Sequence, residues 1–266
     1  MQRRTRSIDF GRSAVQRARM NETVAVILVA GSGTRLGDSA GRPKSLVEVG
    51  GRSMLHRAMA ALSDVGVEEF VLATGYREEL LRDACASWPF SVQFARNAAY
   101  QTTQNAISLL RCRSLVGDRG FWKLDGDVVF VPEVVERIAA LQADIVAGVD
   151  TSVALAEEEM KVRVGGEVCH GAMIVEFGKG LRPEDSAGES IGIERVTQHV
   201  GTQLFDALAA AEQRGQTDLY YEDVYQQMLE KQALKVAMAD ITGLAWTEID
   251  TPEDLAIARN MFDANV

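Results

Sequence analysis

Short apolar runs alternate with helical segments along the first half of the chain. Residues 24–30 form an almost continuous apolar run ahead of a glycine, which is typical of a strand buried on both faces. Leu55, Met59 and Leu62 then follow at helical spacing. The alternation predicts parallel strands joined by crossover helices, and therefore an α/β fold with a mostly parallel sheet. The predicted strands lie at 24–30, 70–74, 91–94, 121–125 and 144–150, and the predicted helices at 54–65, 78–86, 103–111 and 132–141.

The pattern changes after residue 150. Glycines there separate short apolar stretches, and Pro252 suits the first turn of a final helix. We interpret residues 23–266 as a single domain in which an insertion, roughly 150–235, forms a small mixed α/β subdomain. The predicted strands of this half lie at 160–164, 167–170 and 173–177, the apolar segments at 234–239 and 244–249, and the helices at 203–212, 221–231 and 252–262.

Composition and charge narrow the class of protein. The chain has 266 residues, of which 47% are hydrophobic and 25% charged, so it is long and apolar enough to bury a core without disulfide bonds or structural metal ions. Its net charge of −10 argues against nucleic-acid binding. The three cysteines show no CxxC spacing, which indicates neither a zinc knuckle nor a disulfide framework and favours a reducing, cytoplasmic location. No stretch approaches the ~20 apolar residues of a membrane span.

The first twenty residues differ from the rest of the chain. They hold six arginines against one aspartate and contain no apolar run. This composition excludes a secretory signal and predicts a basic, disordered arm at residues 1–22. A transit peptide and a start of translation at Met20 are the alternatives.

A glycine-rich loop follows the first predicted strand. Gly31 and Gly33 allow a ligand to approach the backbone, whose N–H groups can bind phosphate oxygens. The loop lacks the Walker pattern, and it misses the dinucleotide fingerprint because its third glycine, Gly37, comes one position late. Taken alone, such a loop is more often a tight turn. The flanking cations Arg35 and Lys44 favour a triphosphate, and we expect both in an exposed loop.

Several motifs together resemble a known family, the nucleotidyltransferases, which join a nucleotide to a sugar phosphate or a phosphoalcohol. The resemblance covers almost the whole chain after residue 22. The stretches 103–109, 160–162 and 189–192 resemble the branch that contains phosphocholine and inositol-phosphate cytidylyltransferases. The motifs are Ala30-Gly31-x-Gly33-x-Arg35-Leu36, Pro43-Lys44-x-Leu46, Gly50-Gly51, Thr74-Gly75-Tyr76, Thr103-Gln104-Asn105, Asp125-Gly126-Asp127, Met160-Lys161-Val162, Glu189-Ser190-Ile191-Gly192 and Glu248-Ile249-Asp250-Thr251-Pro252.

The resemblance implies a fold and an activity. The fold would be Rossmann-like, of the nucleotide-diphospho-sugar transferase type, with residues 150–235 serving as an acceptor subdomain or lid. The activity would be transfer of a nucleoside monophosphate from a nucleoside triphosphate, preferably CTP, to a small phosphorylated alcohol or phosphonate, with release of pyrophosphate. A sugar-1-phosphate nucleotidyltransferase that uses UTP, GTP or dTTP is the nearer alternative, and a non-catalytic nucleotide-binding module is the more distant one. A homodimer is compatible with either activity.

The resemblance also implies a set of site residues. Asp127 and Asp250 would bind Mg²⁺, since magnesium takes carboxylate oxygens, and Asp125 would support them. Arg35 and Lys44 would be the catalytic cations. The nucleotide-binding residues would be Ala30, Gly31, Ser32, Gly33, Thr34, Gly75, Tyr76 and Asn105, and the acceptor-binding residues Ser108, Lys161, Glu189 and Tyr221.

Each of these side chains also has a structural interpretation. Asp127 could cap the helix that Pro132 begins. Asp250 precedes the predicted cap Thr251 and is therefore not needed as a helix cap. The polar residues at 103–108 include at least one helix cap. Lys161 could neutralise the acidic run at 157–159. The cluster Tyr220-Tyr221-Glu222-Asp223 could bind a cationic acceptor, or its tyrosines could belong to the core of an amphipathic helix.

Overall fold

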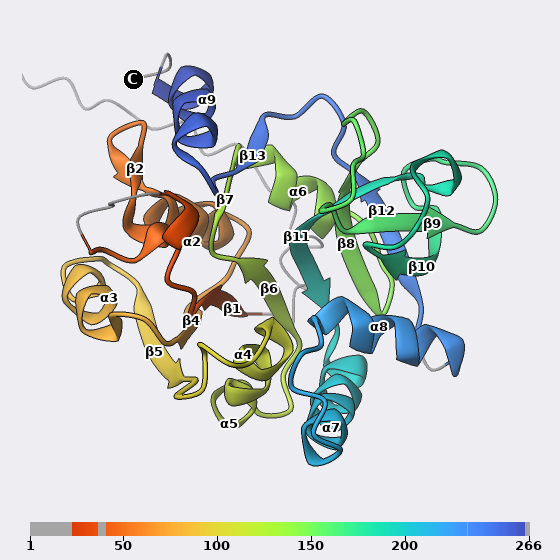
Figure 1. Cartoon of the computed structure of the whole chain (residues 1–266), viewed down its shortest axis with the longest axis horizontal. Helices are drawn as coiled ribbons and strands as arrows, with labels where there is room; N and C mark the ends of the chain where they lie inside the picture. The colour runs from red at the N-terminus through yellow and green to blue at the C-terminus, as the bar shows by residue number, and fades with distance from the viewer. Residues whose placement is uncertain (1–22, 37–40, 233, 264–266) are drawn as a thin grey trace, which may run out of the picture.

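A nine-stranded mixed sheet organises the chain in the computed structural model, which describes residues 23–36, 41–232 and 234–263 (Figure 1). The predicted basic arm at 1–22 and Gly37 lie outside the described residues. In order across the sheet, the strands are β5 (Ser91–Arg96), β4 (Glu69–Thr74), β1 (Val24–Val29), β6 (Phe121–Asp125), β11 (Gly188–Val196), β8 (Ile145–Asp150), β12 (Val236–Asp240), β10 (Met173–Gly178) and β9 (Lys161–Val164).

The sheet contains two groups of parallel strands and several antiparallel strands. Strands β5, β4, β1 and β6 are parallel neighbours, and β8 is parallel to β12. Strand β11 lies antiparallel between β6 and β8, so the two parallel groups point the same way. Strand β9 pairs both with β10 and with the first residues of β11. The segment 150–235 therefore contributes strands to the central sheet itself.

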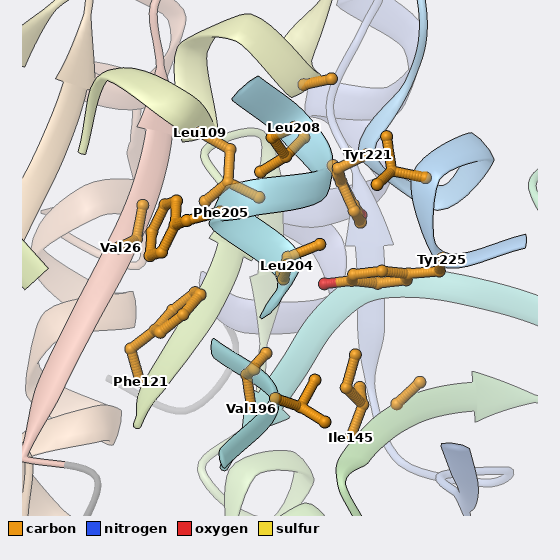
Figure 2. Close-up of a cluster of buried hydrophobic side chains, with 14 of the residues drawn as sticks. Val26, Leu109, Phe121, Ile145, Val196, Leu204, Phe205, Leu208, Tyr221 and Tyr225 are labelled. Atoms are coloured by element: carbon orange, nitrogen blue, oxygen red, sulfur yellow. The ribbon is translucent and has the colours of Figure 1, made fainter. Parts of the chain in front are cut away.

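Helices cover both faces of the sheet because its strands are apolar on both faces. In β1, Val24 and Val26 belong to one buried cluster, whereas Ala25 and Ile27 belong to the other. Figure 2 shows Val26 and Phe121 in the cluster that also holds Leu204 and other side chains of the covering helices. The first cluster lies beneath α4 (Asn105–Arg111), α5 (Arg113–Val116), α7 (Gln198–Gln213) and α8 (Tyr221–Glu230), and the second beneath α2 (Met54–Asp64), α3 (Glu78–Cys85) and α6 (Glu133–Ala139).

A third, smaller cluster forms at one end of the molecule, around α9 (Pro252–Phe262). It includes Leu36, Val129 and Phe262. Helix α9 begins as predicted: Thr251 N donates to Asp254 Oδ2 at 2.8 Å, and Asp254 N donates to Thr251 Oγ1 at 3.2 Å. The remaining short elements are β2 (Glu48–Val49), β3 (Arg52–Ser53), β7 (Val128–Phe130), β13 (Trp246–Glu248) and the 3₁₀ turns η1 (Thr34–Leu36), η2 (Lys44–Leu46) and η3 (Pro183–Asp185).

The predicted elements are confirmed in the first half of the chain, apart from shifts of one or two residues at their ends. In the second half, the predicted strand at 167–170 is wrong, because these residues form an irregular loop between Gly166 and Gly171, both with positive φ. The central strand β11 was not predicted, and α7 begins at Gln198 instead of 203. None of the helices in the described ranges combines the length and hydropathy needed to cross a membrane.

Candidate active site

A cleft of about 1080 Å³ opens at the carboxyl ends of the parallel strands. Its walls are the loop after β1, the turn after β6, the end of β8, the start of β11 and the segment that leads into α9. Open α/β sheets bind ligands at this edge, and small-molecule sites typically measure about 300–1,000 Å³. The cleft therefore has the position and the size of a site for two small substrates.

The glycine loop forms one wall of the cleft. Gly33 has a φ of +61°, and a Cβ built on it would lie 2.8 Å from Lys44 Cβ, so a larger residue would displace that lysine. A Cβ built on Gly31 would meet no atom of the described residues within 4 Å, and Gly31 lines the cleft. The loop thus leaves open space directly beside its backbone, as a phosphate-binding loop requires.

Four charged side chains form a cluster beneath this loop. Lys44 Nζ lies 2.9 Å from Asp127 Oδ2 and also contacts Asp250 Oδ1. Arg35 Nη2 lies 2.7 Å from Asp250 Oδ2. Burial opposes the charge of Lys44, but Asp127 and Asp250 outweigh it and raise the pKa of the lysine. The structure thus brings together the two predicted metal ligands and the two predicted phosphate-binding cations.

Pairing between two short strands brings the two aspartates together. Strand β13 runs antiparallel to β7, with Glu248 opposite Val128, as can be followed in Figure 1. Just beyond this pairing, Ile249 N donates to Asp127 O at 3.0 Å. Asp250 comes next in the chain and therefore lies beside Asp127.

Two sequence-based alternatives are wrong at this cluster. Asp127 does not cap the helix at Pro132: α6 begins there without a side-chain cap, and Asp127 pairs with Lys44. Lys44 is not exposed, since only 13% of its side chain is accessible, against 69% for Arg35. The two aspartates make this burial tolerable, because a buried charge needs a partner of opposite sign.

A second charged cluster surrounds Lys123, whose side chain and that of Glu194 are fully buried, whereas the side chain of Asp125 is 22% exposed at the cleft. Lys123 Nζ has three oxygens around it: Asp125 Oδ2 at 3.2 Å, Glu194 Oε2 at 2.9 Å and Gly192 O at 3.2 Å. The Tyr221 hydroxyl donates to Asp125 Oδ2 at 3.0 Å, and Lys123 Nζ lies 3.4 Å from the centre of the Tyr221 ring. Burial raises the pKa of Glu194 to about 7. Asp125 therefore has different partners from Asp127, although the two residues are close in sequence.

Sequence reasoning missed Lys123 and Glu194. The available signal was a charged residue inside an otherwise apolar strand, as in Trp122-Lys123-Leu124 and Ile193-Glu194. A charge in such a place needs a partner on a neighbouring strand. The partner here is in β11, the strand that the pattern did not predict.

Two predicted acceptor residues have structural roles outside the cleft lining. Tyr221 is fully buried in the second cluster, and its neighbour Tyr220 lines the cleft instead. Lys161 is also buried: its Nζ donates to Ala156 O at 2.6 Å and to Glu159 O at 3.1 Å. Lys161 thus holds the acidic loop at 157–159 through backbone carbonyls.

The other two predicted acceptor residues, Ser108 and Glu189, line the cleft. Asn97 Nδ2 donates to Ser108 Oγ at 3.0 Å. Burial raises the pKa of Glu189 to about 7, and Glu159 and Asp150 add to the effect.

Some of the predicted nucleotide-binding residues line the cleft, and the others lie outside its lining. Asn105 lines the cleft, and its Oδ1 accepts a hydrogen bond from Tyr221 N at 3.0 Å, which fixes the start of α8 against α4. Gly75 and Tyr76 support the loop from behind: Tyr76 N donates to Ala30 O at 3.0 Å, and a Cβ on Gly75 would lie 2.7 Å from the same oxygen. Ser32 is also outside the lining. Of this predicted set, the lining residues are Ala30, Gly31, Gly33, Thr34 and Asn105.

Comparison with known proteins decides the family. Residues 25–228 match the MobA-like NTP transferase domain family. The chain belongs to this family. The sequence-based recognition of a nucleotidyltransferase is therefore confirmed.

Two curated relatives of this NTP transferase domain are informative. The bifunctional IPC transferase and DIPP synthase of Rubrobacter xylanophilus is 32% identical over 238 residues, which are 89% of this chain and 51% of the relative. The CMP-5'-(3-aminopropyl)phosphonate synthase of Streptomyces rubellomurinus is 30% identical over 240 residues, which are 86% of this chain and 37% of the relative. The chain thus spans about half, or less, of the length of these relatives.

A solved structure confirms the predicted Rossmann-like fold of the NTP transferase domain. The inositol-1-phosphate CTP transferase from T. maritima superposes with a TM-score of 0.75 at 23% identity. The match covers 92% of this chain and 96% of that structure. The fold therefore extends over nearly the whole chain.

Proposed function

We propose that this NTP transferase domain transfers a nucleoside monophosphate from a nucleoside triphosphate, preferably CTP, to a small phosphorylated alcohol or phosphonate. The observation that carries the proposal is the cluster of Arg35, Lys44, Asp127 and Asp250 beneath an open glycine loop. The names of the two relatives, an IPC transferase and a CMP-phosphonate synthase, support a cytidine nucleotide and a phosphorus-containing acceptor.

The glycine loop, Arg35 and Lys44 would bind the triphosphate. An oxygen of the acceptor phosphate or phosphonate attacks the α-phosphorus, and pyrophosphate leaves with the electron pair of the broken P–O bond. The acceptor oxygen is already ionised near neutral pH, so no general base is needed. The contribution of the protein is then to position the reactants and to stabilise negative charge on the phosphates and on the departing pyrophosphate.

Asp127 and Asp250 fit a magnesium site. Both offer hard oxygen donors, and their side chains are 32% and 25% exposed at the cleft. In the described ranges, no group of three or more His, Cys, Asp or Glu side chains could hold a metal ion. A pair of carboxylates is nevertheless what Mg²⁺ commonly takes from a protein, with water and phosphate as its other ligands. When bound, Mg²⁺ would supply positive charge to the phosphate groups.

The acceptor would bind at the other side of the cleft, near Ser108 and Glu189. Lys161 and Tyr221 would act there through the residues they hold, the loop at 157–159 and Asp125. Lys179 lines the cleft and is a candidate for the acceptor phosphate that sequence reasoning had assigned to Lys161. Homodimerisation and a cytoplasmic location stay predictions.

Pyrophosphate release tests the proposal. CTP, UTP, GTP and dTTP are each paired with inositol phosphate, phosphocholine, short-chain phosphonates and hexose 1-phosphates, in the presence of Mg²⁺. We expect release with CTP and a small phosphorylated alcohol or phosphonate. Release that requires a hexose 1-phosphate would show the sugar-1-phosphate alternative to be correct. Nucleotide binding without release in any combination would indicate a non-catalytic module.

A further inference from the structure

The ammonium group of Lys44 lies between the two carboxylates that fit a metal site. Lys44 Nζ contacts one oxygen of each carboxylate, Asp127 Oδ2 at 2.9 Å and Asp250 Oδ1. Arg35 Nη2 contacts the other oxygen of Asp250, Oδ2, at 2.7 Å. Three of the four oxygens that the two aspartates offer therefore contact a cation of the protein itself.

A divalent metal ion needs the same oxygens. Mg²⁺ takes carboxylate oxygens as ligands, and an ion shared by Asp127 and Asp250 has to lie between them, as Lys44 Nζ does. The ammonium group and the metal ion repel each other strongly at a separation of a few ångströms. Lys44 is a stronger competitor than Arg35, because it contacts both carboxylates and its side chain is 13% exposed, against 69% for Arg35. Binding of the metal therefore requires the lysine to move.

The course of the Lys44 side chain gives its ammonium group a second set of partners. The side chain runs along Gly33: a Cβ built on this glycine would lie 2.8 Å from Lys44 Cβ, 3.5 Å from Cγ and 3.4 Å from Cδ. Both residues line the cleft. One flexible four-carbon chain therefore serves the carboxylates and the open side of the glycine loop. Rotation of its outer bonds carries Nζ toward a phosphate in the loop while the inner carbons stay beside Gly33.

We propose that Lys44 is an internal substitute for the metal ion. It holds Asp127 and Asp250 together until the complex of metal and triphosphate binds, and then exchanges the carboxylates for the phosphates. Only ionic contacts change in this exchange, and no covalent bond forms or breaks. The consequence is that a divalent metal ion binds weakly to the nucleotide-free protein. This inference rests on the two-aspartate site of the proposed function and adds the way in which that site takes up its metal.

Metal binding to the nucleotide-free protein tests the proposal. The probe is Mn²⁺, which suits carboxylate and water ligands and whose free concentration is measured by electron paramagnetic resonance. Lys44→Ala and Lys44→Met both remove the ammonium group, and Lys44→Met keeps a long side chain beside Gly33. We expect both variants to bind Mn²⁺ at least about 10-fold more tightly than the wild type, because a nearby positive charge is lost. Equal or weaker Mn²⁺ binding in the folded variants would overturn the proposal.

Two control variants locate the effect. Lys231→Ala removes an exposed lysine outside the cleft lining and should keep the wild-type affinity for Mn²⁺. Lys44→Met combined with Asp250→Asn should lose the gain in affinity, because one of the two carboxylates is gone. A gain that persists in this double variant would place the Mn²⁺ ion elsewhere and overturn the assignment.

Thermal denaturation gives a second measurement. Without the lysine, the two aspartates face each other, so Mn²⁺ should raise the melting temperature of Lys44→Ala by more than that of the wild type. This measurement also serves if Lys44→Ala is unstable, since added Mn²⁺ should then restore its folding. The same shift in both proteins, or a failure of Mn²⁺ to stabilise the variant, would contradict the exchange.

The affinity for nucleotide should change in the opposite direction. Isothermal titration calorimetry measures the binding of a non-hydrolysable CTP analogue at saturating Mn²⁺. Lys44→Met should bind the analogue about 10-fold or more weakly, because a charged hydrogen bond to phosphate is lost. Tighter metal binding together with weaker nucleotide binding is specific to an exchange, whereas a merely structural lysine would weaken both. Unchanged nucleotide affinity would show that Lys44 does not move to the phosphates.

The metal titration separates this inference from the proposed function, because it involves no turnover. If no acceptor supports pyrophosphate release but both lysine variants bind Mn²⁺ more tightly, the proposed function fails and the exchange stands. If pyrophosphate is released but the variants bind Mn²⁺ no more tightly than the wild type, the proposed function stands and the exchange fails.

Discussion

The two ends of the cleft differ in how their charges are matched. Beneath the glycine loop, Arg35 and Lys44 face Asp127 and Asp250, so two cations meet two carboxylates. Beside α8, three carboxylates, Asp125, Glu194 and Glu222, lie around one lysine, Lys123. A matched cluster can exchange its internal partners for phosphate and metal charges at a small electrostatic cost. In an unmatched cluster, burial instead raises the pKa values of the excess carboxyl groups, Glu194 to about 7 and Glu222 to about 8.

The two charged clusters also differ in how deeply their side chains are buried. The matched cluster is partly exposed, with Asp127 and Asp250 each about a quarter to a third accessible, and water screens part of each interaction. In the unmatched cluster the side chains of Lys123 and Glu194 are 0% exposed. Removing one charge from a buried pair leaves its partner uncompensated. We therefore expect the nucleotide end to govern turnover, and the acidic end to govern the pH dependence of stability.

The largest expected effect is the loss of a predicted metal ligand. Asp127→Asn and Asp250→Asn should each lower kcat/KM by more than about 100-fold, since even residues that orient metal ligands are worth about 10–100-fold. Pyrophosphate release measures the loss, and thermal denaturation checks that the variants fold. Glu253→Gln, an exposed carboxylate in the first turn of α9, is the control. Wild-type turnover in either folded aspartate variant would refute the two-aspartate site.

The cations of the matched cluster come next. Lys44→Ala should lower kcat/KM by a factor that corresponds to a loss of roughly 2.7–4 kcal/mol of transition-state stabilisation, the scale for removing one preorganised donor. Arg35→Ala should lower kcat/KM by less, because the Arg35 side chain is 69% exposed. Arg35→Lys should recover only part, since an ammonium group cannot form the two-pronged contact of a guanidinium. Kinetics at varied CTP measure these losses, with the exposed Lys231→Ala as a control.

Stability separates the two cations further. Lys44→Ala leaves Asp127 and Asp250 side by side without the lysine between them. We expect a loss of about 1–3 kcal/mol of unfolding free energy, measured by chemical denaturation. Full activity in the folded fraction of Lys44→Ala would show that the lysine serves the fold and not the triphosphate.

The glycine loop at the matched end was predictable from sequence because its requirements are local. The strand Val24–Val29 is a continuous apolar run, and Gly33 adopts a left-handed φ that favours glycine. The contact between Asp127 and Asp250 was not derivable in this way. It depends on the pairing of β13 with β7, two strands of three residues each that lie far apart in the chain.

The unmatched end was not predictable, for a physical reason. Strand β11 carries Glu194 and Arg195 in positions that are almost fully buried, so its local pattern is too polar for a central strand. Lys123 compensates Glu194 from the neighbouring strand β6, and only the folded sheet brings the two together. Charge compensation between distant strands leaves no periodic signal in one sequence.

The acidic end should make stability fall as pH rises. Burial raises the pKa of Glu222 to about 8 in the folded protein, above the ~4.3 of an unfolded glutamate. Between these values the folded state binds more protons, so Glu222 stabilises the fold fully below about pH 4 and loses this contribution as pH rises through about 8. The slope is at most about 1.4 kcal/mol per pH unit for one proton.

Denaturation curves at pH 5 to 8.5 can isolate this contribution. Glu222→Gln should flatten the decline in unfolding free energy, and Glu230→Gln, at an exposed carboxylate on the same helix, should leave it unchanged. The buried Glu194, whose pKa burial raises to about 7, accounts for part of the slope that remains. A variant with an undiminished slope would show that Glu222 is not the titrating group.

The smallest expected effect comes from deleting the basic arm. Residues 1–20 carry six arginines, which could in principle neutralise the acidic end of the cleft. Their composition cannot bury apolar surface, so we expect no lasting contact with the domain. A chain that starts at Met20 should keep its unfolding free energy within about 0.5 kcal/mol, as surface changes do, and its KM for each acceptor. A rise in affinity for any acceptor after deletion would instead mean that the arm competes with acceptors for the cleft.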